Sequence, residues 1–381
     1  MRILQLVSNR WWTGTADPVL SLSRGLQQAG FQVYFGCTRG DTLEKRAQQA
    51  GLSPLPWLSL DPKKPHTFAQ DLLALRRFVQ AEQIDIIHTH LSHDHWLAGL
   101  VKRSCPDPSF LLFRTLHTAR GLHNDPLHRW LFSHQTDHFF TVSRALQEEC
   151  CRVGGIAATR ISVVPGGVDT QRFHPDVDGR SIREEFHLAE TAPVIGIVAR
   201  LAPSRGHLTL LAALQHVVRR YPQVKLLIVG KGEYRPVLER HVRAQGLEKQ
   251  VIFTGYREDD LPAVLAAMDV FVLLHGGSEG SCRALLEAMA MGKACVAGAE
   301  GALQENVEDR RSGLVVDPED PREIAEAILC LLQDRQRAAQ MGREARRRVE
   351  RCFTEKHRVE RTVEVYQARK DQAQRHTGTQ A

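Results

Sequence analysis

The chain has 381 residues, 43% of them hydrophobic and 25% charged, with a formal net charge of +6. This length allows two domains of ordinary size, and the composition is that of a soluble globular protein. No apolar run approaches the roughly 18 residues of a membrane-spanning helix, and the N-terminus lacks the long apolar core of a signal peptide. The eight cysteines show neither paired metal-ligand spacing nor a dense disulfide framework. We therefore expect a cytoplasmic protein.

Strand and helix patterns alternate through the first half of the chain. The predicted strands are residues 2–7, 31–37, 84–88, 110–115, 138–142 and 161–164. The predicted helices are residues 17–29, residues 67–82 and a helix that begins at Arg144. Such alternation is typical of an α/β domain built on a parallel sheet.

A second series of the same kind follows residues 168–190, a stretch in which Pro175, Asp176, Asp178 and Gly179 suit a linker. Its predicted strands are residues 194–198, 225–229, 251–255, 270–274 and 294–297, and its predicted helices are residues 208–221 and 321–333. A charged helix is predicted over residues 354–368, and the polar residues after Asp371 are predicted to be disordered.

The fold class predicted from this pattern is α/β, with two Rossmann-like doubly wound domains over residues 1–170 and 171–353. Ligands of such sheets bind at the carboxyl ends of the strands. Two domains that face each other therefore place a ligand in the cleft between them.

Glu279 and Glu287 lie eight residues apart in a segment that reads as a loop feeding a helix, with Ser281 as the predicted N-cap and Gly292 as the stop. Eight helical steps would separate the two carboxylates by about 80° around the axis and roughly 12 Å along it. The free amides at the start of the helix would face an anion. The carboxylates could bind sugar hydroxyls, and the neighbouring amides could bind phosphate. This combination suits a nucleotide-sugar.

A structural interpretation of the same pair stays open. Glu279 would then only complement the helix dipole, and Glu287 would only pair with Arg283 one turn earlier.

The motifs of the chain, taken in order, resemble those of glycosyltransferase family 4, the retaining group 1 glycosyltransferases of GT-B fold. The resemblance covers nearly the whole chain. Its motifs are Trp12-Thr13-Gly14-Thr15, Ile86-Ile87-His88-Thr89-His90, Arg114-Thr115-Leu116-His117-Thr118, Val142-Ser143-Arg144, Val163–Asp169, Ala199–His207, Val229-Gly230-Lys231-Gly232, Glu279–Glu287 and Gly313–Pro318. It implies an acceptor-binding first domain, a donor-binding second domain, and a C-terminal helix, residues 354–370, that packs back on the first.

The resemblance assigns donor contacts to the second half. Arg200 and Arg205 would clasp the donor diphosphate, and Glu287 would accept hydrogen bonds from both ribose hydroxyls. Glu279 would face the transferred sugar and hold its hydroxyls. Arg205 stands where the family usually has lysine, but a guanidinium also suits phosphate. The competing interpretation is that both arginines are ordinary surface charges.

The amides after Glu279 are expected to meet sugar and phosphate oxygens, which adds Gly280, Ser281, Cys282 and Arg283 to the donor-binding set. The commoner family pattern is Glu-Gly-Phe-Gly, so the serine and the cysteine are departures that leave the donor sugar open. A catalytic nucleophile at Cys282 is the weaker alternative.

His117 ends a predicted strand of the first half, and the resemblance implies that it lies near the transferred sugar. With Arg200, Arg205 and Glu279 it forms the expected catalytic set, the alternative being a satisfied histidine of the core or cleft. Gly14 is expected to let the backbone approach a phosphate or sugar of the donor. Relatives often have two glycines in that loop, where this chain has one.

His88, His90, His93 and His95 form a cluster that could suggest a metal site. They fall across a strand end and a loop, and the implied chemistry needs no divalent ion, so we expect no metal.

Basic residues concentrate between Arg343 and Arg361. Such a run is usually a solvated helix face. The sharper interpretation is peripheral, salt-dependent contact with the acidic inner face of the plasma membrane. No nucleic-acid partner is expected, because no recognition motif accompanies the charge.

The resemblance implies a hexosyl- or related glycosyltransferase that moves a sugar from a nucleoside-diphosphate sugar to a hydroxyl of a glycan or glycolipid. The anomeric configuration would be retained. The transfer would need no metal ion and no cofactor beyond the nucleoside-diphosphate sugar. Bacterial lipopolysaccharide, capsule or glycolipid synthesis is the implied setting. The alternatives are a nucleotide-sugar epimerase of the same fold and a non-catalytic sugar-binding protein. A nicotinamide-dependent enzyme is disfavoured because residues 8–14 lack G-x-G-x-x-G.

Overall fold

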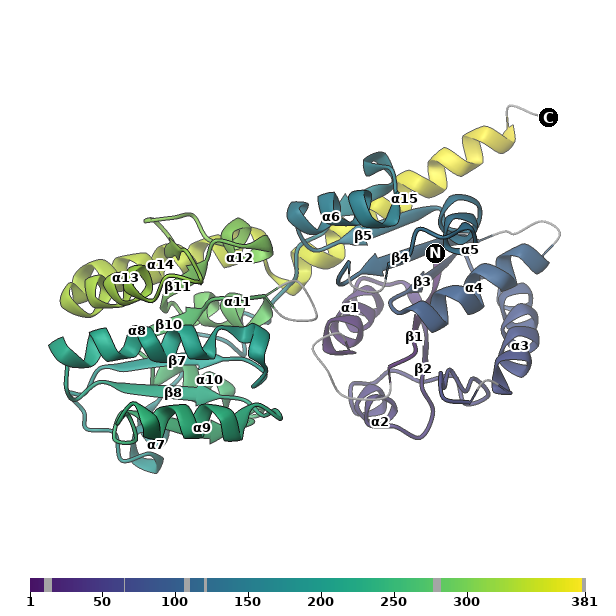
Figure 1. Cartoon of the computed structure of the whole chain (residues 1–381). Helices are drawn as coiled ribbons and strands as arrows, with labels where there is room; N and C mark the ends of the chain where they lie inside the picture. Colours follow the sequence, from purple (N-terminus) through teal and green to yellow (C-terminus); the bar gives the residue numbers. More distant parts are fainter. Residues whose placement is uncertain (10–15, 65, 106–109, 120–121, 277–281, 379–381) are drawn as a thin grey trace. The chain divides into compact units, whose positions relative to one another are not determined.

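The computed structural model of the chain describes residues 1–9, 16–64, 66–105, 110–119, 122–276 and 282–378, the last three of these by backbone only. These residues form two compact units (Figure 1). The first unit contains residues 1–166 and the C-terminal helix from Glu355, and the second contains the described residues between them.

The first unit is built on a six-stranded sheet in the order β2-β1-β3-β4-β5-β6, with every neighbouring pair parallel. Its strands are β1 (Arg2–Val7), β2 (Gln32–Cys37), β3 (Ile86–Thr89), β4 (Leu111–Leu116), β5 (His138–Thr141) and β6 (Ile161–Val163). Its helices are α1 (Ala16–Gln28), α2 (Thr42–Gln49), α3 (Thr67–Ala81), α4 (Ser92–Ser104), α5 (Pro126–Trp130), the π-helix η1 (Leu131–Gln135), α6 (Arg144–Gly154), the 3-10 turn η2 (Ala158–Arg160) and α15 (Glu355–Gly378). Strands β3 and β5 are buried along their whole length, as the central strands of a covered parallel sheet should be.

Helix α15 joins this unit from the far end of the chain and packs on α1. The fit is close, since a Cβ added at Gly25 would lie 2.4 Å from Cγ2 of Val359. Disorder was predicted after Asp371, and that prediction is wrong for the residues up to Gly378, which continue the helix. A helix already nucleated by its packed first turns extends easily through glutamine, alanine and arginine.

The second unit repeats the architecture, with a six-stranded parallel sheet in the order β12-β11-β10-β7-β8-β9. Its strands are β7 (Val194–Val198), β8 (Lys225–Val229), β9 (Val251–Gly255), β10 (Val270–Leu273), β11 (Ala294–Gly298) and β12 (Leu314–Val316). Its helices are α7 (Arg180–Glu185), the 3-10 turn η3 (Pro203–Arg205), α8 (His207–Arg220), α9 (Arg235–Ala244), α10 (Leu261–Ala266), α11 (Arg283–Ala290), α12 (Gly301–Asn306), α13 (Pro321–Gln333) and α14 (Arg335–Cys352). The α/β class and the doubly wound layers predicted from the sequence are confirmed.

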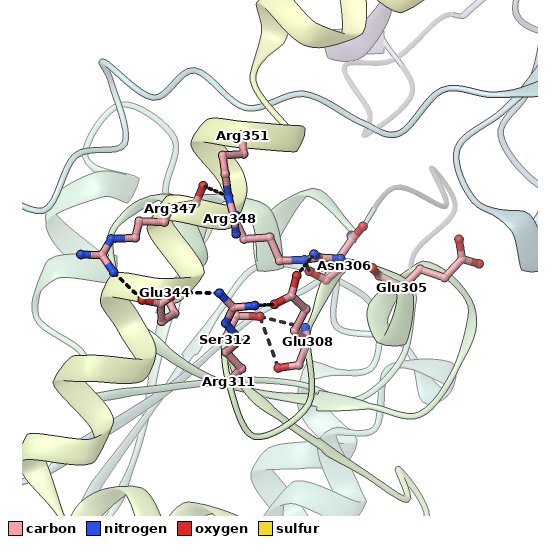
Figure 2. A network of polar contacts seen from close by, with 9 residues as sticks. All are labelled: Glu305, Asn306, Glu308, Arg311, Ser312, Glu344, Arg347, Arg348 and Arg351. Atoms are coloured by element: carbon pink, nitrogen blue, oxygen red, sulfur yellow. Dashed lines mark hydrogen bonds and ion pairs between the residues drawn. The ribbon is translucent and has the colours of Figure 1, made fainter.

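The basic run of the sequence lies mainly on α14, and most of its arginines are used inside the second unit. Arg348 donates to the backbone oxygen of Asn306 at 2.7 Å, and its side chain is only 18% exposed (Figure 2). Arg346 donates to the carbonyls of Phe173 and Ala290, both at 2.7 Å. These two arginines therefore fix α14 to α12 and α11, and the prediction of a solvated face is wrong for them.

Helix α14 also touches the turn that ends α11. A Cβ added at Gly342 would lie 1.9 Å from the carbonyl oxygen of Gly292. Since the obstacle is backbone, it cannot move aside as a side chain could.

We predict that Gly342→Ala lowers the free energy of unfolding by about 2 kcal/mol, because the clash outweighs the roughly 1 kcal/mol by which alanine favours a helix. Thermal melting should show a fall of several degrees. Gln340→Ala, on the exposed side of the same helix, is the matched control. A melting temperature of Gly342→Ala equal to that of the control would contradict this account of the packing.

Candidate functional site

A cavity lies within the first unit, at the carboxyl ends of β3, β4, β5 and β6. Its volume of about 40 Å³ is enough for a few water molecules. Helix α1 gives it an apolar wall, which includes Val19 and Leu22, and α15 contributes Arg358 and Thr362. The strand ends contribute histidines, so the cavity has one apolar side and one polar side, and Arg358 is the charged residue in its lining.

His117 follows β4 and lines this cavity. Its side chain is 93% buried, and neither ring nitrogen has a hydrogen-bond partner among the described residues. Burial lowers the pKa of His117 to about 4, and the charges of Arg114 and Arg358 add to that shift. The imidazole is therefore neutral near pH 7 and offers one donor and one acceptor to a ligand.

His88 lies within β3 and His90 directly follows it, and their rings stack on each other with centroids 4.4 Å apart. Nδ1 of His88 lies 2.5 Å from the hydroxyl of Tyr366 on α15, and Nε2 of His88 lies 2.8 Å from the hydroxyl of Thr115. Nε2 of His90 lies 2.9 Å from the amide oxygen of Gln5. Burial lowers the pKa of His88 to about 3. These contacts tie α15 to the strand ends that form the cavity.

The other two histidines of the cluster serve different contacts. His95 bonds Thr136 at 2.8 Å and the guanidinium of Arg114 at 2.7 Å, and His93 packs edge-on against Phe68. Within the described part of the chain, no group of three or more potential ligands could hold a metal ion.

In the second unit, Arg200 and Arg205 lie on the connection between β7 and α8 and have different surroundings. Arg200 is exposed and places Nη2 3.0 Å from each carboxylate oxygen of Glu233. Arg205 is half-buried, and its buried Nη1 has no hydrogen-bond partner in the part of the chain that the structure describes. Burial lowers the pKa of Arg205, while nearby Cys282 and Glu300 oppose that shift.

Helix α11 begins at Arg283, and its N-cap is Cys282 rather than the predicted Ser281. Cys282 is buried and adopts a left-handed conformation with φ of 55°, which is uncommon for a residue with a side chain. Because the helix starts at Arg283, the predicted separation of the two glutamates along a helix does not apply.

Glu287 lies inside α11 and is 95% buried. Nε of Arg283 donates to its Oε1 at 2.7 Å, so the structural pairing considered from the sequence is present. Burial raises the pKa of the Glu287 carboxyl, and Arg283 and Arg172 counteract part of that rise.

The structure thus pairs Arg283 with Glu287 inside the second unit, and the charge of Cys282 acts on the pKa of Arg205. Four predicted site residues lie outside the described residues: Gly14, Glu279, Gly280 and Ser281.

Sequence reasoning missed several residues that the fold places at these sites. Arg358 and Tyr366 lie on the C-terminal helix that was expected to pack on the first domain, but their individual contacts with the strand ends were not predicted. His275 and Glu300 follow β10 and β11, and their position just after apolar strands was a usable signal.

Comparison with known proteins gives the family. The profile described as glycosyl transferases group 1 matches residues 178–348, and the profile described as glycosyltransferase family 4 matches residues 12–172. The chain belongs to this glycosyltransferase family. The two profiles fall on the two units, so both halves of the family fold are represented.

Two curated members of this glycosyltransferase family are similar in sequence. The GDP-mannose-dependent alpha-(1-6)-phosphatidylinositol monomannoside mannosyltransferase of Mycolicibacterium smegmatis is 41% identical over 187 residues, 47% of this chain and 49% of that protein. A UDP-Gal:alpha-D-GlcNAc-diphosphoundecaprenol alpha-1,3-galactosyltransferase of Escherichia coli is 25% identical over 312 residues, 78% of this chain and 79% of that protein. The chain thus matches about half the length of the mannosyltransferase.

The fold also matches a solved structure, Anabaena HepE in complex with UDP, with a TM-score of 0.83, 20% identity and coverage of 97% of this chain and 100% of that one. At this identity the match supports the GT-B fold. Among the described residues, no helix is both long and apolar enough to cross a membrane.

The depressed pKa of His117 predicts an acid-labile first unit. The folded-state pKa of about 4 lies below the ordinary value of 6.5, so the unfolded chain binds the extra proton first as pH falls. The contribution of neutral His117 to the free energy of unfolding is fully present above pH 6.5. It is lost as the pH falls from 6.5 to 4, and the loss amounts to about 3 kcal/mol.

Denaturant unfolding between pH 4 and 8 checks this prediction. His117→Gln should make the loss of stability on acidification shallower, because the group that titrates is gone. His134→Gln, at an exposed position of the same unit, is the control and should keep the slope of the natural protein. An unchanged slope for His117→Gln would show that His117 is not neutral in the folded state.

Proposed function

We propose that the protein transfers a sugar from a nucleoside-diphosphate sugar to an acceptor hydroxyl with retention of the anomeric configuration. The observation that carries this proposal is Arg205, whose buried Nη1 lacks a partner beside Cys282 at the start of α11. A buried guanidinium nitrogen without a hydrogen-bond partner is unfavourable unless a bound anion accepts its hydrogen bond. A diphosphate is the anion that the family uses.

The proposed roles follow the chemistry of each group. Arg205, Arg200 and the first amides of α11 stabilise the negative charge that grows on the departing diphosphate, with no metal ion or cofactor. Glu287 accepts from the ribose hydroxyls after its contact with Arg283 rearranges. Glu279 and Gly280 to Arg283 hold the sugar and the phosphate oxygens, and Gly14 lets the backbone approach.

His117 is proposed to hold a hydroxyl of the transferred sugar, because both of its ring nitrogens are unpartnered beside the cavity. Being neutral, it contributes positioning rather than charge. We propose front-face attack by the acceptor without a covalent enzyme intermediate. Proton NMR of the product tests retention, and an inverted anomer would refute it.

For the substrates, we propose a hexose donor and a glycolipid acceptor of the lipopolysaccharide, capsule or glycolipid pathways. The names of the relatives support this, since both act on lipid-linked acceptors with GDP-mannose or UDP-galactose. Such an acceptor would bring the protein to the inner face of the membrane as a peripheral partner. Binding to anionic vesicles that weakens with salt would support this, and its absence at low salt would oppose it.

A donor screen tests the central proposal. Thermal melting with UDP-, GDP- and ADP-sugars should identify one nucleotide that stabilises the protein, and diphosphate release should then depend on an added acceptor. The assay should be repeated with EDTA, in which activity should persist because the proposed transfer needs no metal ion. Stabilisation without acceptor-dependent release would favour an epimerase or a sugar-binding protein.

Arg205→Ala should lower kcat/KM about 10²–10³-fold, equivalent to roughly 2–4 kcal/mol of lost transition-state stabilisation. It should not lower the melting temperature of the free protein, because the removed group is not satisfied there. Arg205→Lys should keep part of the activity, and Arg200→Ala should also reduce it. Arg219→Ala, on the exposed face of α8, is the control. Equal activity of Arg205→Ala and Arg219→Ala would end the proposed role of Arg205.

A further inference from the structure

The solvent face of α3 carries an exposed leucine. The helix lies beside α4 at the outside of the first unit (Figure 1). It buries Leu75 and Val79 in the core and turns the opposite face to solvent. On that face Leu73 is 56% exposed, and Ala69 and Arg77, one turn before and one turn after it, are exposed as well. The helix therefore presents apolar surface to solvent as well as to the core.

Trp57 extends this apolar surface from the loop that precedes α3. Its side chain is 38% exposed, and its ring lies against that of Phe78 on α3, with the ring centroids 5.1 Å apart. Ala74 lies one turn before Phe78 on the helix and directly after Leu73 in the chain. A small side chain thus separates the indole from the leucine. Apolar side chains gathered on one face in this way are typical of an interaction surface.

The exposed charges between this indole and the end of α3 are positive. Lys63 and Lys64 are exposed in the loop before the helix, and Arg77 is exposed on the helix. The two acidic residues of the same stretch, Asp61 and Asp71, are buried. Asp71 accepts from two backbone N–H groups of the loop, at 2.9 and 3.0 Å, so its charge is used inside the unit. Together with the indole and the leucine, the three basic residues form what we call the α3 surface.

The basic residues of α14 and its neighbours in the second unit differ in this respect. Arg347 pairs with Glu344, and Arg311 lies 3.0 Å from a carboxylate oxygen of Glu308 (Figure 2). Carboxylates on that side of the second unit therefore offset much of the positive charge. On the α3 surface the carboxylates are buried, and the positive charge stands beside exposed apolar side chains.

We propose that the α3 surface docks the first unit on an anionic lipid bilayer. The inference rests on the proposed function, because an acceptor held in a lipid surface requires the protein to work there. Leucine and indole side chains favour the boundary between headgroups and acyl chains, and lysine and arginine favour the lipid phosphates. A bilayer accepts such protruding side chains without a complementary pocket, whereas a folded protein partner would need one.

Cosedimentation of the full chain with vesicles tests the contribution of charge. The natural protein should bind phosphatidylcholine vesicles that contain phosphatidylglycerol, should not bind pure phosphatidylcholine vesicles, and should bind less as salt is added. The combined variant Lys63→Gln, Lys64→Gln, Arg77→Gln should bind about 10²-fold more weakly, because each basic residue near an anionic surface contributes about fivefold.

The matched control removes the same charge from exposed positions of the second unit, in the combined variant Arg311→Gln, Arg347→Gln, Arg351→Gln. This control should bind the anionic vesicles like the natural chain. An equal loss of binding in both triple variants would show that net charge alone attracts the protein, and it would overturn the docking through α3.

Two further variants test the contact of the apolar side chains with lipid. Leu73→Ser should bind the anionic vesicles about tenfold more weakly, because its exposed apolar area no longer leaves water. Leu127→Ser, at a position of α5 that is 68% exposed in the same unit, is the control and should bind like the natural chain. Brominated lipids should quench the tryptophan fluorescence of the natural protein, and Trp57→Phe should lose most of that quenching.

Unchanged binding by Leu73→Ser, or unchanged quenching in Trp57→Phe, would refute the proposed docking. A natural chain that leaves the vesicles unbound but forms a dimer that Leu73→Ser dissociates would refute it too, because the face would then join two copies of the chain.

Thermal stabilisation by UDP-glucose and GDP-mannose, measured on the same proteins, separates docking from the proposed transfer. The α3 variants should be stabilised like the natural chain, because α3 lies outside the donor-binding unit. Stabilisation of a natural chain that binds no vesicles ends the docking proposal and leaves the donor function standing. Vesicle binding that depends on α3, in a chain that neither nucleotide stabilises, supports the docking and counts against the donor function for these two sugars.

Discussion

Parallel strand pairing is the constraint on which both candidate sites depend. In each unit all six strands run the same way, so their carboxyl ends come together at one edge of the sheet. His117 in the first unit and the connection holding Arg205 in the second both occupy that edge. Because inner strands such as β3 and β10 are buried along their whole length, the edge is where polar side chains meet space that the core does not fill.

In the first unit, buried polar contacts hold the carboxyl-end edge of the sheet against the C-terminal helix. Tyr366, His88 and Thr115 form a continuous chain of hydrogen bonds that begins on the C-terminal helix and ends on the central sheet. Burial favours their neutral forms, and neutral groups that satisfy one another cost little to keep from water. At the end of this arrangement, both ring nitrogens of His117 and Nδ1 of His90 lack a hydrogen-bond partner among the described residues.

Much of the fold could be predicted from the sequence because the strands are short apolar runs separated by helical periodicity, as at residues 194–198 and 225–229. Strand order was beyond such reasoning. β10 lies between β7 and β11, and this arrangement brings His275 to Glu300 and Glu319. The N-cap of α11 was misplaced because serine has the better capping propensity, whereas tertiary packing places a buried cysteine there.

Two unfavourable features occur together where α11 begins, and neither would persist without a compensating role. Cys282 is held in a left-handed conformation at a cost of about 1–2 kcal/mol, and Arg205 nearby keeps a buried nitrogen without a partner. Both place positive potential, from helix amides and from a guanidinium, at one point before any ligand arrives. Charge that develops on a leaving diphosphate is stabilised best by donors already oriented in this way, because they need no reorganisation during the reaction. The proposed binding of a diphosphate would account for this strain, and the surrounding core of the second unit supplies the stability that maintains it.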